Sequence, residues 1–220
     1  SGDMTPNLNL IKMHPTGPTG NHRLNCAIIG ERQYRSGRSA FDAARPMTRA
    51  GVDAIVRYVD MSSVRIDGAY TPEGRPASTT PAMMGAAAAA TSMEDNNKSQ
   101  LGFLKEGITN PLISAFGGDR VPPVSPWVRD MQAPKLIAFP LGLMPPAPWI
   151  PQVVPLQIMR IGELVLVAVP AEVTIVAGLR LRTIVADAMR VSMDNVLVQG
   201  YSNAYTQYVT TPEEYDTQQY

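Results

Sequence analysis

The chain has 220 residues, with 19 Lys plus Arg and 19 Asp plus Glu, so its formal net charge is zero. Because a broad nucleic-acid surface normally needs a basic excess, no nucleic-acid partner is expected. Hydrophobic residues make up 45% of the sequence, which is enough for a folded core. The single cysteine, Cys26, excludes an internal disulfide and a cysteine-based zinc cluster within the chain. No apolar run approaches the ~18 residues of a membrane-spanning helix, and no signal peptide is visible.

The first part of the sequence predicts a loop followed by a helix. The sequence starts at Ser1 without a methionine, which suggests a processed chain or a piece cut from a longer one. Residues 1–20 are rich in Gly and Pro and predict an ordered loop. Residues 21–44 show a helical pattern with a rough apolar face, and Asn21 or Asn25 is the expected N-cap.

A strand and an irregular segment follow. β-Branched and aromatic residues predict strand over 52–66, with a bend at 61–63. Residues 68–100 look irregular. Their alanine run at 86–90 fits a short helix and a low-complexity packing segment equally well.

Residues 110–155 are proline-rich and carry both tryptophans, Trp127 and Trp149. Proline fixes φ and holds such a segment extended, so a long loop is expected here. A loop of this length is more than a connection and predicts a role of its own.

The last third predicts a strand hairpin and a βαβ unit. Residues 156–161 and 164–169 flank Gly162-Glu163, which is typical of a hairpin turn. The continuous apolar run at 164–169 predicts a strand buried on both faces, as does 195–200. Between them, 174–189 predicts a helix, so we expect an α/β domain with a mixed sheet.

Polar residues gather where these two buried strands end. Glu172 lies between the first strand and its helix, at the edge where α/β sheets bind ligands. Its alternative role is a first-turn Glu that only stabilises the helix. Residues 200–208 follow the second strand and hold three tyrosines, which could bind a metal or simply pack with their hydroxyls in water.

A hydroxyl nucleophile is the other chemistry that the sequence offers. Thr5 follows Asp3 in a turn, and its activation would need a base, for which only His14 and His22 are available. The alternative is a Thr in an Asx-type turn. Ser1 could also act as an N-terminal nucleophile if it is the mature terminus.

Three stretches together resemble the neutral ceramidases, and most closely their actinobacterial members. The stretches are Gly-Asp-Met-Thr-Pro-Asn at 2–7, Arg-Ile-Gly at 160–162 with Val-Pro-Ala-Glu-Val-Thr-Ile-Val-Ala-Gly-Leu-Arg-Leu-Arg at 169–182, and the tyrosine-rich segment from 200 to 220. This family hydrolyses N-acylsphingosine to a fatty acid and a sphingoid base with a catalytic Zn²⁺. The resemblance therefore implies a zinc amidase acting on ceramide or a related N-acyl lipid.

The resemblance also implies a site. The family holds zinc with two His, one Glu and one Tyr, and Glu172 and Tyr208 fall on the Glu and Tyr ligands. Tyr220 matches a tyrosine that contacts the substrate amide or its oxyanion. Thr5 falls on the family's active-site Ser, which is described as a nucleophile or as a substrate-binding hydroxyl.

The sequence also departs from the family. The two His ligands belong to the family's N-terminal half, so residues 1–220 correspond to the C-terminal portion of the catalytic domain, without the immunoglobulin-like domain. Thr5 replaces Ser, Gln207 stands where His is common, and 93–97 replaces a Gly-rich turn. We expect a second chain or a missing N-terminal segment to supply the histidines. The alternative is a non-catalytic subunit for binding or assembly.

The family resemblance carries three further expectations. It implies a secreted or cell-envelope location. The loop with Trp127 and Trp149 could line an acyl groove or contact a membrane surface, although packing against the missing half is favoured. Strands that would pair with that half would leave open edges, so the isolated chain is expected to be poorly soluble or oligomeric.

Overall fold

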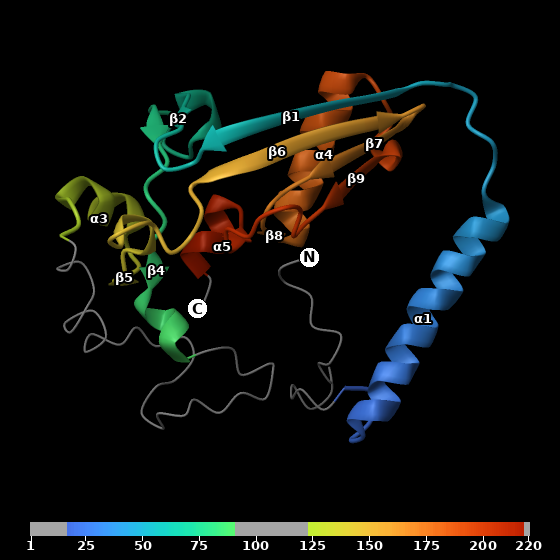
Figure 1. Cartoon of the computed structure of the whole chain (residues 1–220), viewed down its shortest axis with the longest axis horizontal. Helices are drawn as coiled ribbons and strands as arrows, with labels where there is room; N and C mark the ends of the chain where they lie inside the picture. The colour runs from blue at the N-terminus through green and yellow to red at the C-terminus, as the bar shows by residue number, and fades with distance from the viewer. Residues whose placement is uncertain (1–16, 91–122, 218–220) are drawn as a thin grey trace.

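The computed structural model describes residues 17–90 and 123–217. Their central element is a four-stranded mixed sheet with one long helix on it, and smaller elements lie at one end (Figure 1). No helix in these two ranges is long and apolar enough to cross a membrane. The helices and strands, in chain order, are α1 (His22–Ala43), β1 (Val52–Asp60), β2 (Arg65–Ile66), η1 (Gly68–Tyr70), β3 (Ala77–Ser78), β4 (Met84–Gly85), η2 (Ala86–Ala90), α3 (Pro126–Gln132), β5 (Ile137–Phe139), η4 (Leu141–Leu143), β6 (Val153–Ile161), β7 (Leu164–Ala168), β8 (Glu172–Val173), α4 (Ile175–Met189), η5 (Met193–Asn195), β9 (Val196–Gln199), β10 (Tyr208–Val209) and α5 (Pro212–Thr217).

The main sheet has the order β1-β6-β7-β9. β6 and β7 form the predicted antiparallel hairpin, and its turn residue Gly162 has a φ of +59°, which suits glycine. β7 and β9 run parallel, with Val165 opposite Val196, and α4 is the crossover between them. The expected α/β class and the βαβ unit are therefore confirmed.

The core lies between α4 and the sheet. A run of buried side chains from β7, α4 and β9 forms it, because each strand turns every second residue toward the helix. Among the described residues the prediction of strands buried on both faces is wrong, because α4 covers one face and Leu197 on β9 is 47% exposed. The buried members of this cluster are Val165, Val167, Val185, Ala186 and Val196.

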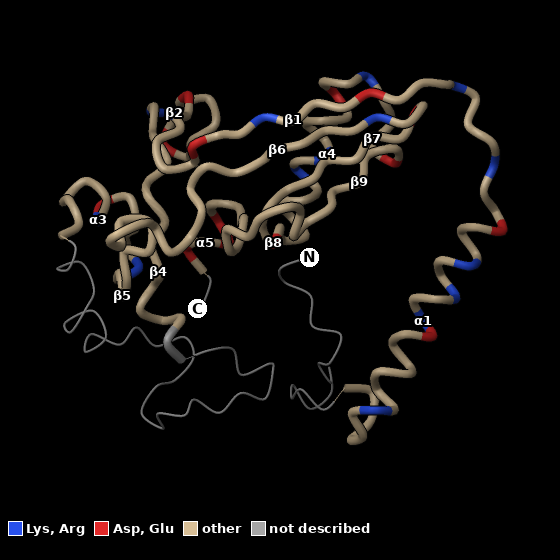
Figure 2. Tube along the Cα trace, viewed as in Figure 1, with Lys and Arg blue, Asp and Glu red and all other residues tan. Residues whose placement is uncertain are grey.

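The predicted helix at 21–44 is confirmed, and Asn21 caps it by accepting a hydrogen bond from the Leu24 amide at 3.1 Å. The predicted strand at 52–66 is β1, a turn and β2. α1 is almost fully exposed, with Asn25 as its single buried residue. Basic and acidic residues are interspersed along it (Figure 2), and Arg35 pairs with Glu31 at 2.7 Å. Such i,i+4 pairs support a helix that has little packing.

The predicted long extended loop at 110–155 is only partly found. Its described part contains α3, β5 and η4. Ser125 caps α3 and Pro126 follows at the first helical position, where a missing N–H costs nothing. Proline here begins a helix, so the prediction of an extended chain is wrong for residues 126–132. The alanine run, whose two alternatives were left open, is the short helix η2.

The segment around α3 forms a second, smaller cluster of buried side chains. Val124, Val128 and Ile137 are buried there and Met83 packs against them. α5 connects to this unit because the Tyr215 hydroxyl donates to the Gln132 carbonyl at 2.8 Å. The burial of Tyr215 raises the pKa of its hydroxyl.

Candidate functional site at the carboxyl ends of the strands

Glu172 lies where the sequence analysis placed it, between β7 and α4. It belongs to β8, and α4 begins three residues later at Ile175 with Thr174 as the N-cap. The alternative of a first-turn helix residue is therefore wrong. Glu172 is half-buried.

β8 pairs in parallel with β10 and places Tyr208 directly opposite Glu172. The Glu172 amide donates to the Gln207 carbonyl at 2.8 Å, and the Thr174 amide donates to the Val209 carbonyl at 3.1 Å. Paired residues on neighbouring strands are about 5 Å apart and share a face of the ribbon. The fold thus brings together two residues that are 36 positions apart in the sequence.

Two further tyrosines contact the same carboxylate. The Tyr205 hydroxyl donates a hydrogen bond to Oε1 of Glu172. A hydrogen bond to Glu172 also raises the pKa of Tyr201. The rings of Tyr201 and Tyr205 stack with their centroids 6.0 Å apart. The alternative of a tyrosine hydroxyl left in water is therefore wrong for Tyr205. The tyrosine cluster was predicted from the sequence, but its contacts with Glu172 were not.

The backbone of the loop 200–208 is held in an unusual conformation. Tyr201, Asn203 and Gln207 have φ values of +56°, +63° and +67°. Asparagine tolerates this left-handed region, but Tyr and Gln are strained there. Such strain persists only where surrounding contacts impose it, and it is often found at functional sites.

The contacts that impose this conformation come from the turn before Glu172. The Tyr201 amide donates to the Ala171 carbonyl at 3.1 Å, and the Thr206 amide donates to the Pro170 carbonyl at 2.8 Å. Gly200 lies so close that an added Cβ would be 2.9 Å from the Ala171 oxygen. Hydrogen bonds and close backbone packing therefore join the two segments next to Glu172.

The other candidate residues are not gathered here. Thr5, Tyr220, His14 and Ser1 lie outside the described residues. His22 is the exposed first residue of α1, which projects away from the sheet (Figure 1). Trp127 and Trp149 are 48% and 63% exposed.

Glu172 and Tyr208 suit part of a zinc site. Carboxylate oxygens are regular zinc ligands, and a phenolate is a further oxygen donor. Within the described ranges, no group of three or more His, Cys, Asp and Glu could hold a metal ion. Within the described residues, Glu172 and Tyr208 therefore offer two oxygen donors, which is fewer than a zinc site needs.

The fold and this site define an α/β protein with a cluster of oxygen donors at its strand ends. The family model described as neutral/alkaline non-lysosomal ceramidase, N-terminal, matches residues 2–220. The chain belongs to this family.

Individual relatives agree with the family model. The chain is 39% identical to the neutral ceramidase of Pseudomonas aeruginosa over 223 residues and 39% identical to that of Mycobacterium tuberculosis over 220 residues. All of this chain is covered, but only 32% and 33% of those proteins. The chain therefore spans about a third of the length of these relatives.

Solved structures give the same result. A structure titled "Ceramidase complexed with C2" matches with a TM-score of 0.79 and 35% identity, and this chain covers 33% of it. The crystal structure of the Pseudomonas aeruginosa neutral ceramidase matches with a TM-score of 0.73 and 32% identity. The fold of the chain is thus that of about one third of a neutral ceramidase.

Proposed function

We propose that this chain is part of a zinc-dependent amidohydrolase that cleaves the N-acyl amide of ceramide or of a related N-acyl lipid. The products are a fatty acid and a sphingoid base. The observation that carries this proposal is the parallel pairing of Tyr208 with Glu172, which brings together the two residues matching the family's zinc ligands. Membership in the ceramidase family supports the substrate class.

In this proposal, Glu172 and Tyr208 hold zinc together with two histidines from a complementary segment. That segment is either an N-terminal part of the same protein or a second chain. Zinc, when bound, polarises the amide carbonyl and lowers the pKa of water. Tyr220 hydrogen-bonds the substrate amide or its developing oxyanion, and Thr5 supplies the hydroxyl that the family's Ser supplies.

The chain would form the C-terminal portion of the catalytic domain over residues 1–220. Its coverage of 33% of a solved ceramidase supports a partial domain. We also propose a secreted or cell-envelope location and a close relationship to the actinobacterial members of the family. Both proposals rest on the family resemblance. Contact with a membrane surface would give the enzyme access to its lipid.

A non-catalytic subunit for binding or assembly is the second candidate. The replacement of Ser by Thr5 favours it, as does the lack of a complete ligand group among the described residues. Against it stands the ordered arrangement of three tyrosines around Glu172, which a site without function does not need.

The test is zinc content and amide hydrolysis, measured on the chain assembled with its complementary segment. We expect about one zinc per chain by elemental analysis, and release of fatty acid from a short-chain fluorescent ceramide. Glu172→Gln and Tyr208→Phe should each lower zinc affinity by more than about 100-fold, since loss of a ligand exceeds the 10–100-fold effect of its supporting residues.

Glu163→Gln is the matched control for these variants. Glu163 is a carboxylate in the β6–β7 turn that accepts a hydrogen bond from Thr48 at 2.6 Å, far along the strands from Glu172. Its substitution should leave zinc content unchanged. An assembled protein that binds no added zinc and hydrolyses no ceramide would contradict the proposal and favour the non-catalytic subunit.

A further inference from the structure

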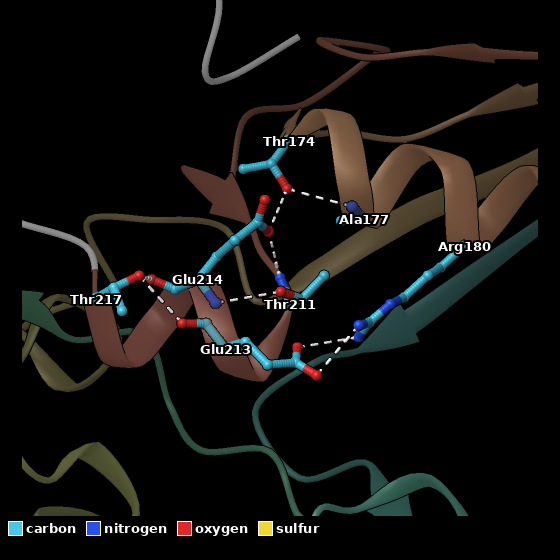
Figure 3. A network of polar contacts seen from close by, with 7 residues as sticks. All are labelled: Thr174, Ala177, Arg180, Thr211, Glu213, Glu214 and Thr217. Carbon is cyan, nitrogen blue, oxygen red and sulfur yellow. Dashed lines mark hydrogen bonds and ion pairs between the residues drawn. The ribbon is translucent and has the colours of Figure 1, made fainter.

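A polar network joins the N-termini of α4 and α5 (Figure 3). Thr211 and Glu214 form a capping box at the start of α5. The Thr211 amide donates to Oε2 of Glu214 at 2.8 Å, and the Glu214 amide donates to Oγ1 of Thr211 at 3.2 Å. This reciprocal pair satisfies two backbone donors that the helix itself leaves without partners.

The same Glu214 carboxylate also reaches the second helix. Oγ1 of Thr174 donates to Oε2 of Glu214 at 2.7 Å and accepts from the Ala177 amide at 3.4 Å. Thr174 is the N-cap of α4. One carboxylate oxygen therefore links the capping residues of two helices that are remote in sequence.

This link is shielded from water. Thr174 and Thr211 are only 3% and 4% exposed, and Glu214 is half-buried. Hydrogen bonds to an ionised carboxylate are stronger than neutral ones, and a low-dielectric surrounding strengthens them further. The network is thus a firm connection rather than a surface contact.

The network is placed to control the pairing of Glu172 with Tyr208. Thr174 follows Glu172 by two residues, and Thr211 follows Tyr208 by three. The β8–β10 ribbon itself is only two residue pairs long. Because so short a ribbon is weak alone, its geometry depends on what holds its ends together.

We propose that Thr174 and Glu214 are positioning residues that fix the separation of Glu172 and Tyr208 and thereby set the zinc affinity of the site. This inference rests on the proposed function. Neither residue is assigned contact with zinc or substrate. They act through the two strands whose ends they join.

A second link between the same helices provides the matched control. Arg180 on α4 and Glu213 on α5 form a two-bond ion pair, with both N–O distances 3.1 Å. Its side chains are 53% and 70% exposed, so water and salt weaken it. Because the Glu213 carboxylate also interacts with Thr211, the pair is best broken from the Arg180 side, which alters the contact between α4 and α5 but changes no residue of the buried network.

The experiment measures zinc affinity by chelator competition on the chain assembled with its complementary segment. Thr174→Val keeps the side-chain shape and removes the hydroxyl, and Glu214→Gln keeps the shape and removes the charge. We expect each to weaken zinc binding by about 10-fold or more, within the range for residues that orient metal ligands. Thr174→Ser should keep zinc affinity within about 3-fold of wild type, and Arg180→Gln should leave it unchanged.

Measuring Glu172→Gln in the same assay distinguishes a failure of the proposed zinc site from a failure of the positioning role. If Glu172→Gln leaves zinc affinity unchanged, the zinc site itself is wrong. If Glu172→Gln abolishes binding while Thr174→Val and Glu214→Gln retain wild-type affinity, the positioning role alone is overturned. The melting temperature of each variant is recorded without zinc, and a lowered melting temperature with unchanged zinc affinity also overturns the inference. If Thr174→Val does not fold, the zinc affinities of Thr174→Ser and Glu214→Gln test the positioning role instead.

Discussion

The βαβ unit and the β1–α1 region both contain large apolar side chains, but these side chains are buried in the first and exposed in the second. In the βαβ unit, Val165 and Val196 are 0% exposed. In β1, Val56 is 51% exposed and Tyr58 is 73% exposed, and in α1 Phe41 is 72% exposed. Local pattern is sufficient to specify a helix or strand, whereas burial requires a partner surface.

The largest expected effect is the difference in stability between truncating a buried valine and truncating an exposed one. Val165→Ala should lower the free energy of unfolding by about 2–3 kcal/mol, because it removes buried methyl groups and leaves a cavity. Val56→Ala should change it by less than about 0.5 kcal/mol, since that side chain is half in water. Denaturant unfolding of the assembled protein measures both, and equal losses would break the comparison.

A glycine pair extends the comparison to the turn before β7 and to α1, because Gly→Ala should change the free energy of unfolding in opposite directions at these two positions. Gly162 has a positive φ, and an added Cβ would be 2.5 Å from the Arg49 oxygen. Gly162→Ala should therefore cost about 1–3 kcal/mol. Gly37 in α1 has nothing within 4 Å of an added Cβ. Gly37→Ala should stabilise that helix by about 0.5–1 kcal/mol.

Amide hydrogen exchange checks the glycine pair locally. Exchange should become faster in β6 and β7 for Gly162→Ala and slower in α1 for Gly37→Ala. A slower rate in β6 and β7 after Gly162→Ala would show that the turn accepts a side chain.

The smallest effect belongs to the exposed ion pair between α4 and α5. The hydrogen bond from Arg180 lowers the pKa of Glu213 from 4.5 to about 2. Because the folded pKa is the lower one, the stabilisation is fully present above pH 4.5 and is lost as the pH falls toward 2. NMR titration of the Glu213 carboxyl carbon should give a midpoint near 2, and Arg180→Gln should move it back toward 4.5. A wild-type midpoint near 4.5 would contradict the pair.

Much of the fold could be predicted from the sequence, because the signals were local. Turn chemistry at Gly162, the cap at Asn21 and the apolar periodicity of α4 each depend on a few neighbouring residues. β8 and β10 were missed since each is two residues long, and their pairing arises only when distant segments meet. α3 was missed because its proline was interpreted as extending the chain rather than as beginning a helix.

The site was predictable in part for the same reason. The positions of Glu172 and Tyr208 followed from strand ends and from the family resemblance. The hydrogen bond from Tyr205 and the shared carboxylate of Glu214 did not, because no local pattern indicates which distant side chain completes a cap. The T-x-x-E spacing of Thr211 and Glu214 could have predicted the capping box, but not its link to Thr174.

The pairing of β1 with β6 has a consequence for the order of folding. Asp60 pairs with Val153, so forming this contact closes a loop of about 90 residues. The β6–β7 hairpin closes over two residues and can form in microseconds. Because the entropy lost on loop closure grows with loop length, β1 should join a preformed hairpin. Until it does, one edge of β6 has unpaired amides and carbonyls, and this interval is when the nascent chain is most open to wrong strand partners.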